Sequence, residues 1–269
     1  MKIGIIAGSG DFPKQIAKEN LDAFVLCVEH HSFPSSFKNH SETVSLIDPS
    51  SWITALKKNK ITHLVMAGKI NRISTKNIPH TKKTHKLLDK ISNLGDNAAL
   101  KLVQNFFNDN GFEILPIKSI LKDCFFNKGF YKEEFFSTKL KDFVIENSRF
   151  GVNLLNTISS FDVGQSAVVR HRLVYAIEAL EGTDAMLVRA GGLFKDYLNN
   201  NNFGPVLVKI PKLNQNFNMD LPVIGLNTIK KCKELGFSSV VVSSEGTLIT
   251  EMQIVKDYLK EQKFCVFAI

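Results

Sequence analysis

Three segments in the second half of the chain place acidic or amide side chains beside glycine or proline, at the edge of an apolar run. They span residues 162–169, 178–186 and 220–225. Core helices and strands do not need this arrangement, but a site for a cation and phosphate oxygens does. Hard cations take oxygen ligands, and glycine lets the backbone approach a ligand closely. The three segments therefore predict a site that binds a cation together with phosphate groups.

The polar candidates in these segments are Asp162, Gln165, Glu178, Glu181, Asp184 and Asp220. Because they offer oxygen donors without Cys or His, they favour Mg²⁺ or Mn²⁺ over zinc. Pro222 restricts Leu221 to extended backbone, which favours a fixed carboxylate at Asp220; a simple turn aspartate is the alternative. Thr183 and Asp184 have an alternative as well, because Thr183 is a good helix N-cap and Asp184 suits the positive helix end.

The chemistry that fits this set is attack of water on phosphorus. A divalent metal would neutralise a diphosphate, Arg or Lys would stabilise the leaving phosphate, and an Asp would orient or deprotonate the water. Glu178 and Glu181 stand on or just after an apolar strand. A carboxylate there needs a metal or a nearby arginine as its partner, and the candidate arginines are Arg170, Arg172 and Arg189.

A glycine loop at the N-terminus is a second candidate site. Its candidate residues are Gly8, Gly10 and Asp11. Gly68 and Lys69, at the end of a later strand, are expected at the same edge of the sheet. Backbone amides at such a strand-to-helix turn can face a phosphate. A dinucleotide fingerprint would have a third glycine where Pro13 stands, so a nicotinamide or flavin enzyme is only an alternative. A tight turn that binds nothing is another.

The composition is that of an ordinary globular protein, with 269 residues, 44% hydrophobic and 22% charged. This length favours two domains. No apolar run approaches the roughly 18 residues of a membrane-spanning helix. The N-terminus reads as a buried strand and not as a signal peptide, so we expect an intracellular protein. The 4 cysteines are widely scattered, which predicts reduced core thiols.

The net charge of +8 suits an anionic partner, whether nucleic acid, acidic lipid or a phosphorylated substrate. The sequence contains no zinc-finger, helix-turn-helix or basic-aromatic module, so we expect no nucleic acid partner. Heavy use of Lys and Asn throughout the chain is the compositional alternative.

Strand and helix patterns alternate through the first half of the chain. Strands are expected at residues 3–7, 23–28, 44–47, 63–67 and 112–115, and helices at 12–20, 51–59, 84–94 and 96–108. This alternation predicts a Rossmann-like α/β domain, a parallel sheet with helices on both faces. The alternation of strand and helix patterns ends at residues 125–136, which are rich in aromatic residues and lysine. We place the domain boundary there, between 1–130 and 131–269.

The second domain is also predicted to be α/β and separately built. Helical spacing runs from residue 136 to 158 with an interruption near Gly151, and a hairpin follows at 167–169 and 173–178 with its turn at 170–172. Further strands are expected at 207–210, 223–226, 239–242 and 264–268, and helices at 227–235 and 250–262.

The motifs occur in one order along the whole chain, and together they resemble the LpxI-type UDP-2,3-diacylglucosamine pyrophosphatases of Gram-negative lipid A synthesis. They are Gly8-x-Gly10-x-x-Pro13, Ala67-Gly68-Lys69, Gly95-Asp96-Asn97-Ala98, residues 162–169, residues 178–187, Pro211-Lys212 and residues 220–225. The Glu-Gly-Thr-Asp-Ala-Met segment and the Asp-Leu-Pro segment are the most specific.

The resemblance implies a two-domain α/β enzyme that binds its lipid nucleotide in a cleft between the domains. It implies Mg²⁺-dependent hydrolysis, with Mn²⁺ as an alternative, in which water attacks the sugar-side phosphorus and yields UMP and 2,3-diacylglucosamine 1-phosphate. Asp220 and Asp184 are the implied catalytic residues, and Asp220, Asp184 and Glu181 the implied metal ligands. The substrate-binding candidates are Gly8, Gly10, Asp11, Gly68, Lys69, Gln165, Thr183, Arg189 and Lys212.

The chain departs from the family pattern at two places. Asn218 stands where family members often have an arginine two residues before the key aspartate, so another cation would have to bind phosphate there. Asn97 stands where a second aspartate is common.

A substrate with two acyl chains implies a cytoplasmic protein with peripheral contact to the inner membrane. Positive charge and exposed aromatic side chains in residues 125–136 would favour that contact; packing between domains is the alternative use of this stretch. A homodimer is a candidate assembly. A non-catalytic binding protein for a lipid or nucleotide sugar is the competing function besides the oxidoreductase.

Overall fold

The computed structural model describes residues 1–70, 96–121, 123–194, 203–213, 215 and 221–269. These residues form two compact units. Unit 1 contains the described residues within Met1–Lys122, and unit 2 those within Asp123–Gln215 and Asp220–Ile269. The boundary predicted after residue 130 thus falls inside unit 2, because β6 (Gly129–Phe130) pairs with β13 (Cys265–Ala268) of the unit 2 sheet.

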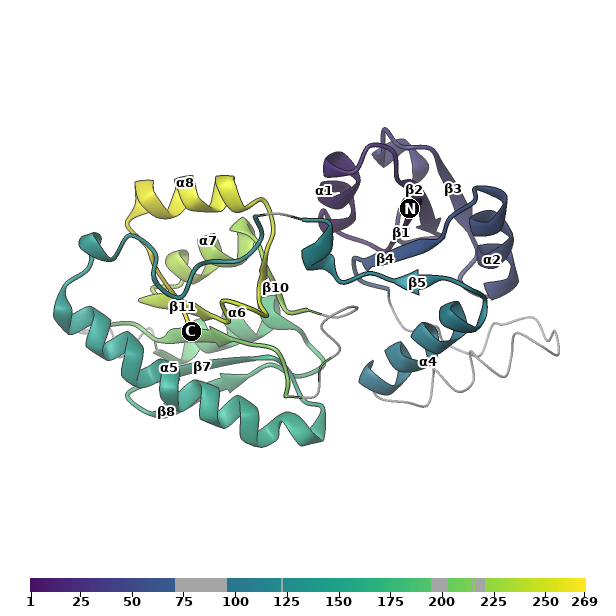
Figure 1. The fold of residues 1–269 in the computed structure, drawn as a ribbon. Helices are drawn as coiled ribbons and strands as arrows, with labels where there is room; N and C mark the ends of the chain where they lie inside the picture. The colour runs from purple at the N-terminus through teal and green to yellow at the C-terminus, as the bar shows by residue number, and fades with distance from the viewer. Residues whose placement is uncertain (71–95, 122, 195–202, 214, 216–220) are drawn as a thin grey trace. The chain divides into compact units, whose positions relative to one another are not determined.

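Unit 1 is built on a parallel five-stranded sheet in the order β3-β2-β1-β4-β5 (Figure 1). The strands are β1 (Ile3–Ala7), β2 (Phe24–Val28), β3 (Ser41–Val44), β4 (His63–Ala67) and β5 (Glu113–Ile114). The helices are α1 (Phe12–Glu19), α2 (Pro49–Lys58) and α4 (Asp96–Asp109). This order confirms the predicted Rossmann-like sheet. The helix predicted at residues 84–94 lies outside the described residues.

Helix α2 explains why β3 ends earlier than predicted. The side chain of Asp48 caps the helix by accepting from the backbone N–H of Ser50, 3.1 Å away, and Pro49 occupies the first turn. Trp52 donates from Nε1 to the carbonyl of Ser45 at 2.7 Å. Residues 45–48 therefore turn into the helix, and the strand predicted at 44–47 lies instead at Ser41–Val44.

Unit 2 contains a mixed six-stranded sheet in the order β6-β13-β11-β9-β7-β8. Besides β6 and β13 its strands are β7 (Ser166–Arg170), β8 (Leu173–Ile177), β9 (Val206–Lys209) and β11 (Ser239–Val242). Unit 2 also contains a separate two-stranded parallel sheet, formed by β10 (Val223–Ile224) and β12 (Leu248–Ile249). The second predicted α/β domain is thereby confirmed.

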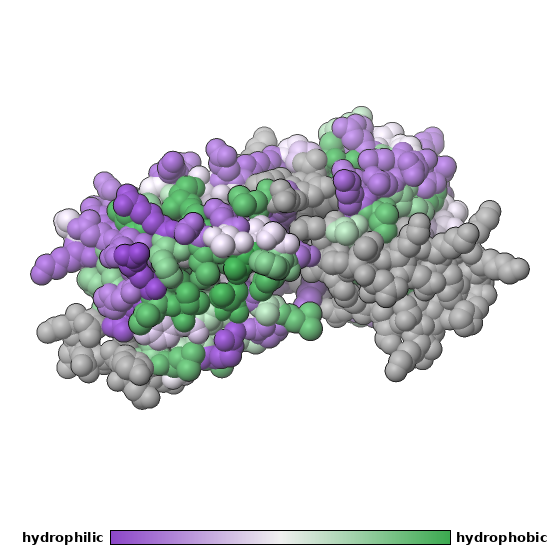
Figure 2. Space-filling model, turned by 90° about the horizontal axis from the view of Figure 1, so that it is seen from below, coloured by the Kyte–Doolittle hydropathy of each residue, from purple (hydrophilic) through white to green (hydrophobic). Residues whose placement is uncertain are grey.

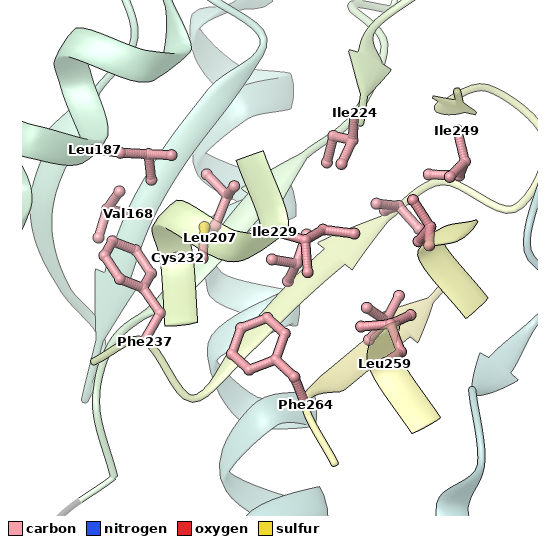
Figure 3. Packing of buried hydrophobic residues seen from close by; sticks show 14 of the residues in the cluster. Val168, Leu187, Leu207, Ile224, Ile229, Cys232, Phe237, Ile249, Leu259 and Phe264 are labelled. Carbon is pink, nitrogen blue, oxygen red and sulfur yellow. The ribbon is translucent and has the colours of Figure 1, made fainter. Parts of the chain in front are cut away.

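Helices cover both faces of the unit 2 sheet. Helix α5 (Thr138–Ile158) packs on one face, and α6 (Thr183–Phe194), α7 (Leu226–Glu234) and α8 (Met252–Gln262) pack on the other (Figure 1). Figure 3 shows the core of the second face, in which Leu187 of α6 lies beside Val168 of β7, and Ile229 of α7 points into the same interior.

Helix α5 runs without a break, so the predicted interruption near Gly151 is wrong. A Cβ at this position would lie 2.6 Å from a methyl carbon of Val208 in β9. The glycine therefore serves the close approach of helix and sheet, which local sequence spacing does not reveal.

The β7–β8 hairpin turns at His171 and Arg172, as predicted. Both have left-handed backbone, with φ of 50° and 61°. Two such residues are what a two-residue type I′ hairpin turn requires.

The aromatic stretch predicted for membrane contact packs inside unit 2. Phe126 is buried, and its ring lies 5.3 Å from that of Tyr131. Phe130 stacks on Phe267 of β13 at 4.3 Å between ring centroids. The strand pairing of β6 holds these rings against the sheet, so the expectation of an exposed aromatic patch at residues 125–136 is wrong.

Two further expectations concern membranes and thiols. None of the helices in the described part of the chain combines the length and apolarity that a membrane crossing requires. Cys27, Cys124, Cys232 and Cys265 are buried free thiols, as predicted. Burial raises the pKa of the Cys265 thiol to about 11, so it is an unreactive core residue.

Candidate functional site

At one edge of the unit 2 sheet, three strand ends bring predicted site residues together. Strand β7 runs antiparallel to β8 and β9, so its start lies beside their ends: Ser166 pairs with Lys209, and Ala167 with Ile177. Strand β11 is parallel to β9 and ends at the same edge. Ligands of open α/β sheets usually bind at the carboxyl ends of parallel strands. We call this edge, with its loops, the unit 2 edge.

Side-chain alternation along β9 decides which way its last residue points. Val206 and Val208 belong to the core under α5, whereas Leu207 belongs to the core under α6, α7 and α8. Because successive side chains alternate between faces, Lys209 lies on the α6 face. By the same rule Glu178, two residues after the core residue Ala176, lies on that face as well.

A chain of hydrogen bonds joins these two residues through the first residue of α6. The ammonium of Lys209 donates to Thr183 Oγ1 at 2.6 Å, and the Thr183 hydroxyl donates to Glu178 Oε1 at 2.7 Å. Only 8% of Lys209 is exposed. The network therefore holds a buried cation and a half-buried carboxylate on opposite sides of one hydroxyl group.

The charge state of Glu178 follows from these contacts. Burial by itself would raise the pKa of this carboxyl. The positive charge of Lys209 is the largest opposing effect, and together with the hydrogen bonds that the carboxylate accepts it outweighs burial and holds the pKa below its usual value of 4.5. Glu178 is therefore ionised at neutral pH and balances the ammonium of Lys209.

The predicted metal ligands Asp184 and Glu181 are each paired with a cation. Glu181 Oε1 accepts from Arg189 at 2.7 Å, and this hydrogen bond is the main cause that lowers the pKa of Glu181. Asp184 lies 3.5 Å from the ammonium of Lys231 and has a side chain that is 66% exposed. Within the described residues, no three Asp, Glu, His or Cys side chains are grouped so as to hold a metal ion. The residues described here thus do not form a magnesium site by themselves.

Gly164 and Gln165 tie the start of β7 to the end of β8. A Cβ at Gly164 would lie 2.1 Å from the carbonyl oxygen of Glu178, so only glycine fits between the two backbones. The amide of Gln165 donates to Glu178 Oε2 at 3.4 Å, and its carbonyl accepts from Ile210 N at 3.1 Å. These contacts connect the start of β7 to the end of β8, and the close approach of the two backbones explains why glycine stands at position 164.

Lys212, predicted to bind substrate, is held in an ion pair. Its side chain is 9% exposed, and its ammonium lies 2.5 Å from Asp162 Oδ1. Asp162 has left-handed backbone with φ of 52°, and Ser159 Oγ accepts from Leu213 N at 2.9 Å. Together these bonds join the loop before β7 to the loop after β9.

Asp220, the central catalytic candidate, lies outside the described residues, and so does Asn218. The two residues after it are anchored: Leu221 is buried, and the carbonyl of Pro222 accepts from Leu248 N at 2.8 Å. The neighbouring Thr247 donates its hydroxyl to the carbonyl of Lys209 at 2.8 Å. Through Leu248 and Thr247, Pro222 is therefore tied to the end of β9; the fixed carboxylate expected at Asp220 stays a prediction.

In unit 1, two loops at the carboxyl ends of β1 and β4 pack back to back. Ser9 N donates to Lys69 O at 2.9 Å, and Lys69 N donates to Ser9 O at 3.0 Å. A Cβ at Gly8 would lie 2.7 Å from Lys69 O, and one at Gly68 would lie 2.6 Å from Ser9 O. Both glycines are thus explained by the close approach of two backbones.

A small cavity of about 230 Å³ opens beside this glycine loop. Of the predicted substrate-binding residues, Gly8, Gly10 and Asp11 line it, while Asp11 also pairs with Lys14 at 2.9 Å. Its other lining residues are Lys14, His31, Ser32, Phe33, Ser36 and Phe37. The lining thus combines the Lys14 ammonium with the Asp11 carboxylate that pairs with it.

Pro13 weakens the alternative of a dinucleotide cofactor. It lies in the first turn of α1 and is buried, and a Cβ at Gly68 would meet its ring carbon at 2.8 Å. The position that the fingerprint reserves for close helix–strand packing by glycine is therefore filled by a proline ring.

The structure brings Gln165, Glu178 and Thr183 to the unit 2 edge and adds one residue that sequence reasoning missed, Lys209. A lysine directly after three apolar strand residues was the available signal, because a buried ammonium needs a partner. The predicted arginine partner is found for Glu181, which pairs with Arg189, whereas Glu178 faces the charge of Lys209 across the Thr183 hydroxyl. Arg170 instead donates to the carbonyl of Phe203 at 2.8 Å.

Comparison with known proteins shows which family this chain resembles in sequence. The family model described as LpxI N-terminal domain matches residues 2–124, and the model described as LpxI C-terminal domain matches residues 132–267. The chain is also similar to the UDP-2,3-diacylglucosamine pyrophosphatase LpxI of Caulobacter vibrioides, with 27% identity over 263 residues. That alignment covers 94% of this chain and 92% of the relative.

Proposed function

Because the chain belongs to the LpxI family, we propose that it is a hydrolase that splits the diphosphate of UDP-2,3-diacylglucosamine. The alignment with the Caulobacter pyrophosphatase, which extends over nearly all of both chains, supports this activity most directly. The products are UMP and 2,3-diacylglucosamine 1-phosphate, which places the enzyme in lipid A biosynthesis.

In the proposed reaction, water adds its oxygen to the sugar-side phosphorus. The bond from this phosphorus to the bridging oxygen breaks, and UMP leaves with that oxygen. Asp220 orients the water and accepts its proton, and its place directly before the anchored Leu221 and Pro222 supports this role. Asp184, exposed at the first turn of α6, is the second carboxylate proposed to act on the diphosphate or its water.

Mg²⁺ belongs to the proposal, with Mn²⁺ as the alternative. A bound divalent ion would neutralise charge on the diphosphate. Of the two candidate ligands among the described residues, Asp184 is the more exposed, 66% against 32% for Glu181, and its contact with Lys231 is the longer one, 3.5 Å against 2.7 Å from Glu181 to Arg189. Asp220 would have to supply the other protein ligand. Binding of the metal through both Asp184 and Asp220 remains a prediction.

Unit 2 also offers apolar surface for a lipid substrate. Figure 2 shows apolar residues, drawn in green, over much of the face of unit 2 turned to the viewer. The loops of the unit 2 edge carry exposed apolar side chains of their own, Phe161, Val163, Leu180 and Leu213. We propose that this apolar surface contacts the acyl chains of the substrate and favours peripheral contact of the protein with the inner membrane.

The decisive experiment incubates the purified protein with UDP-2,3-diacylglucosamine and Mg²⁺ in ¹⁸O-water. We expect UMP to be released and the heavy oxygen to appear in the lipid phosphate and not in UMP. A chelator should stop the reaction, and added Mg²⁺ should restore it. Label in UMP would contradict attack at the sugar-side phosphorus, and absence of UMP would contradict the activity itself.

Asp220→Ala tests the catalytic aspartate. Loss of a general base should lower kcat by about a hundredfold or more, with little change in thermal stability. Asp257→Ala is the matched control, since Asp257 is an exposed carboxylate on α8 bonded only to Gln253 in the described contacts. An Asp220→Ala variant with the rate of the control would favour the competing function, a binding protein whose acidic set is structural.

A further inference from the structure

Thr183 uses the single proton of its hydroxyl group within the protein. Its single proton is directed to Glu178 Oε1 at 2.7 Å, and its oxygen accepts from the Lys209 ammonium at 2.6 Å. A hydroxyl has one proton to donate. The direction of the O–H bond is therefore fixed by two charged neighbours, and Thr183 cannot donate to a ligand without releasing Glu178.

Both charged neighbours stand on the sheet. Lys209 is the last residue of β9, and its carbonyl accepts from the buried Thr247 at 2.8 Å. Glu178 directly follows β8, and its amide donates to Ser166 O at 2.9 Å. Gly164 packs against the Glu178 carbonyl and restricts it further. The two groups that hold Thr183 are thus fixed independently of α6.

Packing alone does not require these charges. The apolar face of α6, with Met186, Leu187 and Ala190 fully buried, already fastens the helix to the sheet. A buried ion pair is often no more stabilising than apolar residues of similar volume. The charged pair is therefore better explained by what it orients than by the stability it adds.

We infer that Glu178 and Lys209 are positioning residues: they fix the Thr183 hydroxyl and the first turn of α6, which carries Asp184, at the unit 2 edge. As a statement about catalysis, this inference rests on the proposed function. It assigns Glu178 and Lys209 no contact with the substrate, so their loss should act on the chemical step more than on binding. A misplaced catalytic group costs rate even when substrate still binds.

The first test compares steady-state kinetics of Thr183→Ser, Thr183→Val and Lys209→Met. Thr183→Ser keeps the hydroxyl and should stay within about threefold of the wild-type kcat, whereas the other two variants should lose about a hundredfold in kcat with KM nearly unchanged. Lys58→Met, which removes a surface lysine of unit 1, is the matched control and should keep the wild-type rate. A Lys209→Met variant whose loss lies in KM would overturn the inference, because it would make Lys209 a substrate contact.

The second test separates positioning from stability. The double variant Glu178→Gln with Lys209→Met removes both charges that face each other across Thr183, so its Tm should lie above that of either single variant and closer to the wild type. Its kcat should nevertheless stay low, because the hydroxyl has lost its fixed direction. Recovery of kcat together with Tm would reduce the network to a stabilising role and overturn the inference.

The third test needs no substrate. Amide hydrogen exchange of residues 186–189, whose N–H groups form the first hydrogen bonds of α6, should be faster in Thr183→Val and Lys209→Met than in Thr183→Ser and the wild type. Equal exchange in all four proteins would overturn the positioning of the first turn. A wild-type protein that releases no UMP would count against the proposed function alone, since this arm still measures the positioning.

Discussion

The two units use the same edge of an α/β sheet in different ways. In unit 1 the loops after β1 and β4 meet through backbone bonds between Ser9 and Lys69, and glycines bring them together. In unit 2 the corresponding strand ends carry charged side chains, with Lys209 and Glu178 joined through Thr183. Backbone contacts hold the two unit 1 loops together, whereas in unit 2 charged side chains orient a hydroxyl group. The comparison thus separates a junction built from backbone contacts from one built from charged side chains.

Gly164→Ala should have the largest effect. The new Cβ would lie 2.1 Å from the carbonyl oxygen of Glu178, and neither backbone can move without separating β7 from β8. We expect the free energy of unfolding to fall by about 3 kcal/mol or more, measured by urea denaturation followed by circular dichroism.

Gly192→Ala is the control for Gly164→Ala. It lies in α6, where nothing stands within 4 Å of an added Cβ, and the substitution should stabilise the helix by about 0.5–1 kcal/mol. Equal stability of the two variants would show that the β7–β8 junction can relax, against the close contact described.

Gly8→Ala probes the corresponding junction in unit 1. Its Cβ would lie 2.7 Å from Lys69 O, a milder clash than at Gly164, so we expect a loss of about 2 kcal/mol. The chain has 1 tryptophan, Trp52, and it lies in the unit 1 core, so its fluorescence reports on this unit. We expect each clash to act within its own unit, so a Trp52 transition that shifts as much in Gly164→Ala as in Gly8→Ala would contradict this expectation.

Glu178→Gln tests the charge network by its pH dependence. The pKa of Glu178 is lower in the folded protein than its usual value of 4.5, so the carboxylate stabilises unit 2 above that pH. This contribution is lost as pH falls through the folded pKa. The variant should therefore melt below the wild type at pH 7, and the difference in Tm should shrink toward pH 3. A constant difference across the series would mean that the charge of Glu178 does not contribute.

Lys58→Met should have the smallest effect. Lys58 forms a 3.0 Å ion pair with Glu42 on the surface of unit 1, where its own side chain is 70% exposed. Exposed pairs contribute little, so the free energy of unfolding should change by less than about 0.5 kcal/mol. A larger loss, measured by the same urea denaturation, would weaken the contrast between surface ion pairs in unit 1 and the buried network of Glu178, Thr183 and Lys209 in unit 2.

Local pattern was sufficient where neighbours in the sequence decide the structure. The alternation of strands and helices predicted both sheets, and apolar runs located β1, β4 and β11 to the residue, as Ile3–Ala7, His63–Ala67 and Ser239–Val242. The hairpin turn at His171 was also read correctly. Local pattern failed at Gly151 and in the aromatic stretch of residues 125–136, where contacts with distant strands decide the outcome.

The sequence by itself determined the two α/β units and the polar segments that flank their strands, because periodicity and turn chemistry are local properties. The tertiary structure decided which charges meet. Lys209 and Thr183 stand 26 residues apart in the chain, and only the antiparallel pairing of β7 with β8 and β9 brings Glu178, Thr183 and Lys209 to one edge. A buried ammonium requires a partner, but sequence spacing does not predict which carboxylate the strand pairing brings close to it.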